Sequence, residues 1–195
     1  MDLCEALFIE NKDESENIAD AYLNAGEAGL EIIMSEYSPA LLRYCHSVLC
    51  DYHEAQDAVQ VTFIKAYQSR DKFTGGDKDL SNFLYKIAYN ACIDIIRKRR
   101  FTLELLKNER IKPGKSGGEY IPDNIKIALN LLSVLDRAVI YGRAVEELKF
   151  EELAEIHGKS AASLRKRYER ARKKLSRILE KDYPYYNKRG ENNNE

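Results

Sequence analysis

The chain has 195 residues, 44% of them hydrophobic, and a formal net charge of -1 at pH 7, so one large or two small domains can form cores. It has no apolar run of membrane-spanning length, and its acidic start is unlike a signal peptide, so we expect a cytoplasmic protein without membrane insertion. Four cysteines without a CxxC pair fit reduced, structural thiols.

The near-neutral total conceals a segregated charge distribution. Residues 1–31 hold nine acids against one lysine, whereas residues 86–112 hold eight cations against three acids. Residues 159–177 hold nine cations and one acid. Two basic segments are typical of surfaces that meet a polyanion. We interpret the acidic start as a solvated extension, and the alternative is a segment that shields the basic surfaces.

Hydrophobic periodicity predicts an all-α protein with two small helical domains joined by a flexible linker, the second containing a helix-turn-helix. Helices are expected at residues 15–24, 28–37, 39–50 with Pro39 in the first turn, 54–70, 80–99, 125–141, 150–157 and 161–181. The expected organisation is an acidic N-terminal extension at 1–27, a first domain at 28–100, a linker at 101–124, a second domain at 125–182 and a disordered tail at 183–195.

One cluster could suggest a metal site. His46, Cys50 and His53 would share a face of a continuous helix and could bind zinc. Only three ligands are present, however, and Asp51 favours a turn that would remove His53 from that face. A metal-dependent enzyme around these residues is therefore our last-ranked hypothesis, since paired carboxylates and a suitably spaced base are missing. We expect no metal, no cofactor and no catalytic residue.

The helix at 80–99 carries a narrow polar line on a largely apolar surface. Lys86, Asn90, Asp94 and Arg97 form this line, which is either an edge that contacts DNA or an ordinary solvent-facing stripe. The preceding loop, residues 73–82, places polar groups beside aromatic rings. Unpaired bases need both a stacking surface and hydrogen-bond partners, so the loop is a candidate site for them.

Residues 149–179 predict a helix, a tight turn at Gly158 and a second, strongly cationic helix. An apolar stripe should pack inward, and it comprises Leu164, Tyr168, Ala171, Leu175 and Leu179. Cations should occupy the opposite side, namely Lys166, Arg170, Lys173 and Arg177. Ser160 stands at the N-cap position, so the following residues would face the major groove. The alternative is a solvated basic helix on an ordinary bundle.

Two segments together resemble the bacterial sigma-70 family, specifically its extracytoplasmic-function class. The region 2 pattern D-x-V-Q-x-x-F-x-x-A-Y is carried by Asp57, Val59, Gln60, Phe63, Ala66 and Tyr67, and it is followed by F-L-Y-x-I-A-x-N-x-x-x-D at residues 83–94. Residues 131–175 resemble region 4. Val61 stands where the family usually has an acid, Phe83 where it has tryptophan, and Ser133 where it has proline.

This resemblance implies a non-enzymatic sigma factor that binds core RNA polymerase and promoter DNA, and it leaves open whether an anti-sigma factor binds. It implies polymerase contacts at Asp57, Gln60 and Val61, with Val59, Phe63 and Tyr67 as core. Unpaired minus-10 bases would meet Lys78, Asp79, Asn82, Lys86, Asn90, Asp94 and Arg97. Duplex minus-35 DNA would meet Ser160, Ala162, Ser163, Lys166, Arg167 and Arg170. The alternative function is a stand-alone helix-turn-helix regulator.

Overall fold

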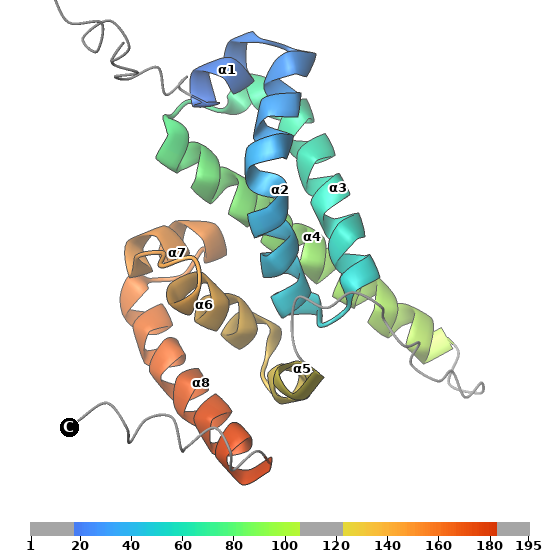
Figure 1. The fold of residues 1–195 in the computed structure, drawn as a ribbon, viewed down its shortest axis with the longest axis vertical. Coiled ribbons are helices and arrows are strands. Elements are labelled where there is room, and N and C mark those ends of the chain that lie inside the picture. Colours follow the sequence, from blue (N-terminus) through green and yellow to red (C-terminus); the bar gives the residue numbers. More distant parts are fainter. Residues whose placement is uncertain (1–17, 106–122, 183–195) are drawn as a thin grey trace, which may run out of the picture.

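The computed structural model describes residues 18–105 and 123–182, which form helices joined by short loops and contain no strand (Figure 1). The elements are α1 (Ile18–Asn24), α2 (Glu27–Leu49), α3 (Tyr52–Gln68), the 3-10 turn η1 (Arg70–Lys72), α4 (Asp77–Leu105), α5 (Asp123–Asn130), α6 (Val134–Ala144), α7 (Phe150–His157) and α8 (Ala161–Asp182). The all-α prediction is confirmed. Within the described ranges, none of the helices is long and apolar enough to cross a membrane.

The first helical unit is built from α1 to α4 around one apolar core. Its largest fully buried side chains include Tyr44, Leu41 and Leu84. Helix α2 ends at Leu49, and its C-cap residue Cys50 adopts a left-handed conformation (φ 56°). Asp51 then accepts a hydrogen bond from the Glu54 backbone N–H (3.0 Å), so its carboxylate caps α3 and fixes the reversal of the chain.

Helix α1 belongs to this core, although the sequence indicated a solvated acidic extension. Tyr22 is fully buried, and its hydroxyl donates a hydrogen bond to the Ala66 carbonyl oxygen (2.6 Å). Gly29 permits the close approach of α1 to α2, since a Cβ there would lie 2.3 Å from the Ala21 carbonyl oxygen. The solvated interpretation is therefore wrong for residues 18–24. Residues 1–17 and the predicted tail at 183–195 lie outside the described residues.

Two predicted helix boundaries are wrong. Helix α2 runs through Pro39 without a break, because buried residues on both sides of the proline, Ile33 and Leu41, anchor one continuous helix in the core. Their burial offsets the lost backbone hydrogen bond, a penalty of about 3 kcal/mol. Conversely, the helix expected at 125–141 is divided into α5 and α6. Ser133 caps α6 by accepting a hydrogen bond from the Asp136 backbone N–H (3.2 Å).

The second helical unit comprises α5 to α8 and contains the expected helix-turn-helix in α7 and α8. Gly158 ends α7 in a left-handed conformation (φ 60°) that favours glycine. Ser160 accepts a hydrogen bond from the Ser163 backbone N–H (3.3 Å) and so caps α8 as predicted. Val139, Leu153 and Leu164 form the buried centre of this unit.

The two units pack against each other, with α6 beside α2 and α7 beside α4 (Figure 1). Ala138 and Ile156 join the apolar core of the first unit. Arg137 of α6, also buried, donates a hydrogen bond to the Cys50 thiol sulfur at the end of α2 (3.0 Å). The linker expected at 101–124 begins later and ends earlier in the structure, because α4 continues to Leu105 and α5 begins at Asp123. Residues 106–122 lie outside the described residues.

Candidate nucleic-acid and polymerase interfaces

Helix α8 presents the predicted cationic face. Lys166, Arg170, Lys173 and Arg177 are all exposed. On the inward side Leu164 and Ala171 are buried, while Tyr168, Leu175 and Leu179 are partly buried. The amphipathic arrangement is therefore confirmed, and the basic side is available to a phosphate backbone.

The residues at the start of α8 are not equally available. Ala162 and Ser163 are exposed beside the capping residue Ser160. Arg167, in contrast, donates a hydrogen bond from Nη1 to Asp136 Oδ1 (2.7 Å), and 34% of its side chain is exposed. Arg165, which sequence reasoning did not single out, stacks its guanidinium over the Phe150 ring (5.1 Å to the centroid). The sequence signal that could have identified Arg165 was its position as a cation directly before Lys166.

The expected base-capturing loop is shorter than predicted, because α4 begins at Asp77. Lys78, Asp79 and Asn82 therefore lie on the first two turns of a helix and only residues 73–76 form a loop. The Asp79 carboxylate accepts a hydrogen bond from the Gly76 backbone N–H (3.1 Å), so it supports the start of α4. This hydrogen bond gives Asp79 a role in capping the N-terminus of α4.

A cavity of about 280 Å³ opens at this point, lined by Lys72, Phe73, Thr74, Asp79, Asn82, Phe83, Lys86 and Glu155. Phe73 and Phe83 lie with ring centroids 5.4 Å apart. Phe73 is buried against Tyr22, whereas Phe83 is partly exposed. The cavity thus combines an aromatic wall with amide and ammonium donors, the groups that an unpaired base and its phosphate require.

Two of the expected minus-10 residues are already bonded to α7. Asn82, which is buried, donates a hydrogen bond from Nδ2 to Glu155 Oε2 (2.8 Å). The Lys78 ammonium lies 2.9 Å from Glu152 Oε1. Burial alone would raise the pKa of Glu152, but the hydrogen bond from Lys78 and the Lys149 backbone N–H lower it. The same hydrogen bond has the opposite effect on its donor, and it raises the pKa of Lys78.

The polar line farther along α4 is present. Lys86 and Asn90 are exposed. Asp94 is half-exposed and lies between two cations, 3.5 Å from Lys65 and 3.3 Å from Arg97. Lys65, from α3, was not among the predicted residues because its proximity to Asp94 depends on how α3 packs against α4. Asp94 orients cations here, and its own charge would repel a phosphate.

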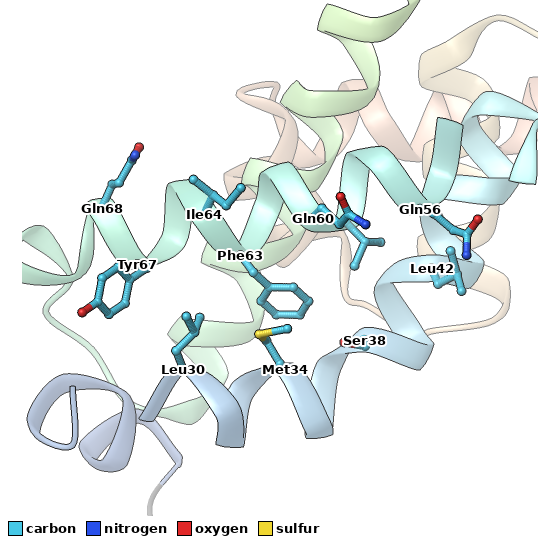
Figure 2. A pocket seen from close by; sticks show the side chains of 11 residues that line it. Leu30, Met34, Ser38, Leu42, Gln56, Gln60, Phe63, Ile64, Tyr67 and Gln68 are labelled. Carbon is cyan, nitrogen blue, oxygen red and sulfur yellow. The ribbon is translucent and has the colours of Figure 1, made fainter. Parts of the chain in front are cut away.

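An apolar groove of about 530 Å³ lies between α2 and α3 (Figure 2). Its labelled side chains include Leu30 and Met34 from α2 and Ile64 and Tyr67 from α3, with Phe63 pointing toward Met34 in its floor. Ile64 and Met34 are 56% and 42% exposed. Such a concentration of exposed apolar side chains on one face is typical of a protein-binding surface.

The groove revises the expected division between core and interface. Val59 and Phe63 are buried, as predicted, but Tyr67 is 38% exposed and its assignment to the core is wrong. Asp57, Gln60 and Val61 are all exposed. Gln60 lines the groove, whereas Val61 lines a separate cavity shared with α4. Ile64 was the missed signal for this interface. It lies one turn after the exposed Gln60, so the two residues share one face of α3.

The possible metal ligands are not brought together. Cys50 is engaged by Arg137, and His46 is buried against the Tyr52 ring (centroids 5.8 Å apart). Burial, and then the positive charge of Lys126, lower the pKa of His46. His53 lies on α3, beyond the break between the helices. In the part of the chain that the structure describes, no group of three His, Cys, Asp or Glu side chains could hold a metal ion.

Comparison with known proteins identifies both units. Residues 33–102 match the family model for sigma-70 region 2, and residues 124–175 match that for sigma-70 region 4. The chain is 28% identical to the ECF RNA polymerase sigma factor SigW of Bacillus subtilis over 75% of this chain and 87% of SigW. It is 29% identical to RNA polymerase sigma factor YlaC of the same organism, over 78% of this chain and 92% of YlaC.

Solved structures agree. The sigma factor RpoE in complex with the anti-sigma factor NepR from Bartonella quintana is similar with a TM-score of 0.66 and 27% identity, over 77% of this chain and 96% of RpoE. CnrH in complex with the cytosolic domain of CnrY gives a TM-score of 0.65 and 25% identity, over 85% of this chain and 96% of CnrH. With two matching regions in the family order and relatives of nearly the same extent, the chain belongs to the sigma-70 family as a sigma factor of the extracytoplasmic-function class.

Proposed function

We propose that this sigma factor binds core RNA polymerase through the α2–α3 groove, reads minus-35 duplex DNA with α8 and captures unpaired minus-10 bases at the start of α4. One observation carries the proposal: the exposed apolar groove and two cationic helix surfaces lie on one chain. A factor with these three surfaces can hold polymerase and two promoter elements at once. It performs no covalent chemistry of its own.

The polymerase contact is assigned to the groove because the family pattern places α3 at that interface. Gln60 and Ile64 supply a polar and an apolar contact from adjacent turns of α3, and Met34 supplies one from α2. Burying exposed apolar area yields about 25 cal/mol per Å², so the apolar residues would provide most of the affinity. Asp57 and Val61 are exposed on α3 outside the groove, and they extend the proposed contact beyond it.

The two DNA contacts differ in kind. The exposed cations of α8 neutralise phosphates, while Ser163, Lys166 and Ala162 at its start lie where a recognition helix meets base edges. On α4, the exposed Lys86 lines the cavity at Phe83, and Asn90 lies exposed one turn beyond it. Extruding a base costs a few kcal/mol, which a site with donors and an aromatic wall can repay.

Promoter-directed transcription takes place with polymerase in the cytoplasm, so we place the chain there. The similar RpoE structure is a complex with the anti-sigma factor NepR, and we extend this kind of partner to the present chain. An anti-sigma factor would act by covering the polymerase groove or the DNA-binding helices. Neither role requires a bound cofactor.

Run-off transcription tests the function directly. Core polymerase is incubated with genomic fragments, with and without the chain, and the start sites of the products are mapped. We expect discrete transcripts that depend on the chain and share minus-35 and minus-10 sequences. A stand-alone regulator would instead bind duplex DNA without polymerase and would give no new start site. That second outcome would contradict the proposal.

A further inference from the structure

The docking of α7 on α4 places two carboxylates on the groups proposed for minus-10 DNA. Glu152 Oε1 lies 2.9 Å from the Lys78 ammonium, as a phosphate oxygen would. Glu155 Oε2 accepts the hydrogen bond from Asn82 Nδ2 (2.8 Å) and forms one wall of the cavity beside Phe83. The carboxylate oxygens thus replace a phosphate and a base-edge acceptor, respectively.

We propose that α7 is an internal mimic of DNA, and that Glu152 and Glu155 mask the minus-10 site of the free chain. The inference rests on the proposed function, because it assumes that the start of α4 binds the minus-10 strand. An unpaired strand and α7 cannot occupy Lys78 and Asn82 together. Capture of the strand therefore requires α7, and with it the second helical unit, to leave α4.

The rest of the docking surface stabilises the masked state. The Tyr89 ring of α4 packs edge-on against His157 at the end of α7 (centroids 4.5 Å apart). Ile156 is buried in the core formed by the first unit. At the other end of the contact, Cys50 is covered by Leu129 and Leu132 and bonded by Arg137. The Lys78–Glu152 pair adds little by itself, since the Lys78 side chain is 66% exposed and solvent screens the interaction, and the apolar contacts supply most of the stability.

This coupling is reciprocal. If α7 lowers the affinity of α4 for single-stranded DNA, then DNA bound at α4 must lower the affinity of α7 for α4 by the same factor. A change that weakens only the masking contact should therefore tighten DNA binding by the free chain. Glu155 is suited to such a change, because it is exposed and its hydrogen bond is made to Asn82. Glu152 is less suited, since it also accepts the Lys149 backbone N–H and caps α7 (2.6 Å).

The test compares Glu155→Ala with Glu151→Ala in the full chain. Both variants remove one carboxylate from α7, but Glu151 is exposed and forms no ion pair with a described residue. Opening is followed by the reaction rate of the Cys50 thiol in a Cys4→Ser background, since Cys45 and Cys92 are fully buried in the core of the first unit. DNA binding is followed with a short, fluorescent, random-sequence single-stranded DNA.

We expect Glu155→Ala to raise both the thiol reaction rate and the affinity for the single strand about tenfold, with Glu151→Ala at the wild-type level. Equal values for the two variants would overturn the proposal, as would a faster thiol reaction without tighter DNA binding. Circular dichroism shows whether each variant is folded; if Glu155→Ala is not, Glu155→Gln is compared with Glu151→Gln. Wild-type transcription with saturating polymerase reports the proposed function separately: its absence contradicts that function, whereas its presence with an unresponsive Glu155→Ala contradicts only the mask.

Discussion

Arg167 of the recognition helix α8 is bonded to Asp136 of α6, with Nη1 2.7 Å from Oδ1. The same guanidinium nitrogen reaches the hydroxyl of Ser133, the residue that caps α6 (3.5 Å). Arg167 therefore holds α8 against α6 inside the second unit. Lys166, its neighbour in sequence, is exposed and faces away from that contact. Two adjacent cations, both predicted to read DNA, thus have different structural roles.

The first prediction separates these roles by alanine substitution. Arg167→Ala should lower the free energy of unfolding by about 1 kcal/mol, because a partly exposed charge-assisted bond is lost. Lys166→Ala should leave the unfolding midpoint unchanged and weaken binding to minus-35 duplexes selected from a random pool. Thermal unfolding and fluorescence anisotropy measure the two effects. If Arg167→Ala unfolds like the wild type and relaxes preference at a single base, Arg167 is a base reader and the structural role is wrong.

The second prediction concerns the α2–α3 groove. Ile64→Asp should reduce affinity for core RNA polymerase about tenfold, since a charge would enter the apolar centre of the contact. Ile127→Asp on α5 is the matched control, because both isoleucines are 56% exposed and Ile127 lies outside the groove. Binding is measured by surface plasmon resonance with immobilised core enzyme. Equal losses for the two variants would place the polymerase contact elsewhere.

A third prediction tests whether α1 is part of the core. Tyr22→Phe should destabilise the chain by about 1 kcal/mol, because the buried hydroxyl loses its bond to the Ala66 carbonyl oxygen. Burial is the main cause that raises the pKa of Tyr22 to about 12. Tyrosine ionises near pH 10 when unfolded, so its contribution to stability is complete below that pH and is lost as the pH rises toward 12. Chemical denaturation at neutral and alkaline pH measures both effects, and Tyr22→Phe should show the weaker alkaline loss.

The sequence contained enough local information for most helices and for the helix-turn-helix. Ser160, Gly158 and the apolar stripe through Leu164 specify their conformations from nearby residues, and the structure agrees. The S-x-x-D pattern at Ser133 and Asp136 also specified a helix start, but the apolar period continued across it and concealed the break. At Pro39 the error was the opposite one: the sequence predicted a helix start, but α2 is continuous there. The burial of residues on both sides outweighs the local penalty of a proline.

The docking of the two units could not be predicted in this way. Asn82 and Glu155 are separated by 73 positions in the sequence, and Arg137 and Cys50 by 87. Each residue has an ordinary local environment, and its partner follows only from how complete helices pack. For the same reason the groove was missed: Met34 and Ile64 become neighbours only when α2 lies against α3. Periodicity identifies which face of a helix is apolar, but it does not identify the helix that covers it.

The last prediction concerns the pH dependence of the contact between α7 and α4. Burial lowers the pKa of His157 from its ordinary value of 6.5 to about 4, and neither ring nitrogen has a hydrogen-bond partner among the described residues. Tyr89 of α4 is the titratable side chain that faces this ring, and Arg167 of α8 lies close enough to lower the pKa of Tyr89 after burial has raised it. A protonated His157 would therefore have no counter-charge from these neighbours.

The lowered pKa of His157 sets the direction in which pH changes the stability of the docked state. The docked state holds His157 neutral, so its stability is complete above about pH 6.5 and decreases as the pH falls toward 4. If undocking restores the ordinary pKa, acidification from about pH 7.5 to about pH 5.5 should favour the open state about tenfold. Small-angle X-ray scattering of the wild type should then show a larger radius of gyration at the lower pH. His157→Gln should reduce that change in radius of gyration and leave only the contribution of His46. The pKa of His46 is also lowered, by burial and by the charge of Lys126. Identical pH dependence in the two proteins would show that His157 does not control docking.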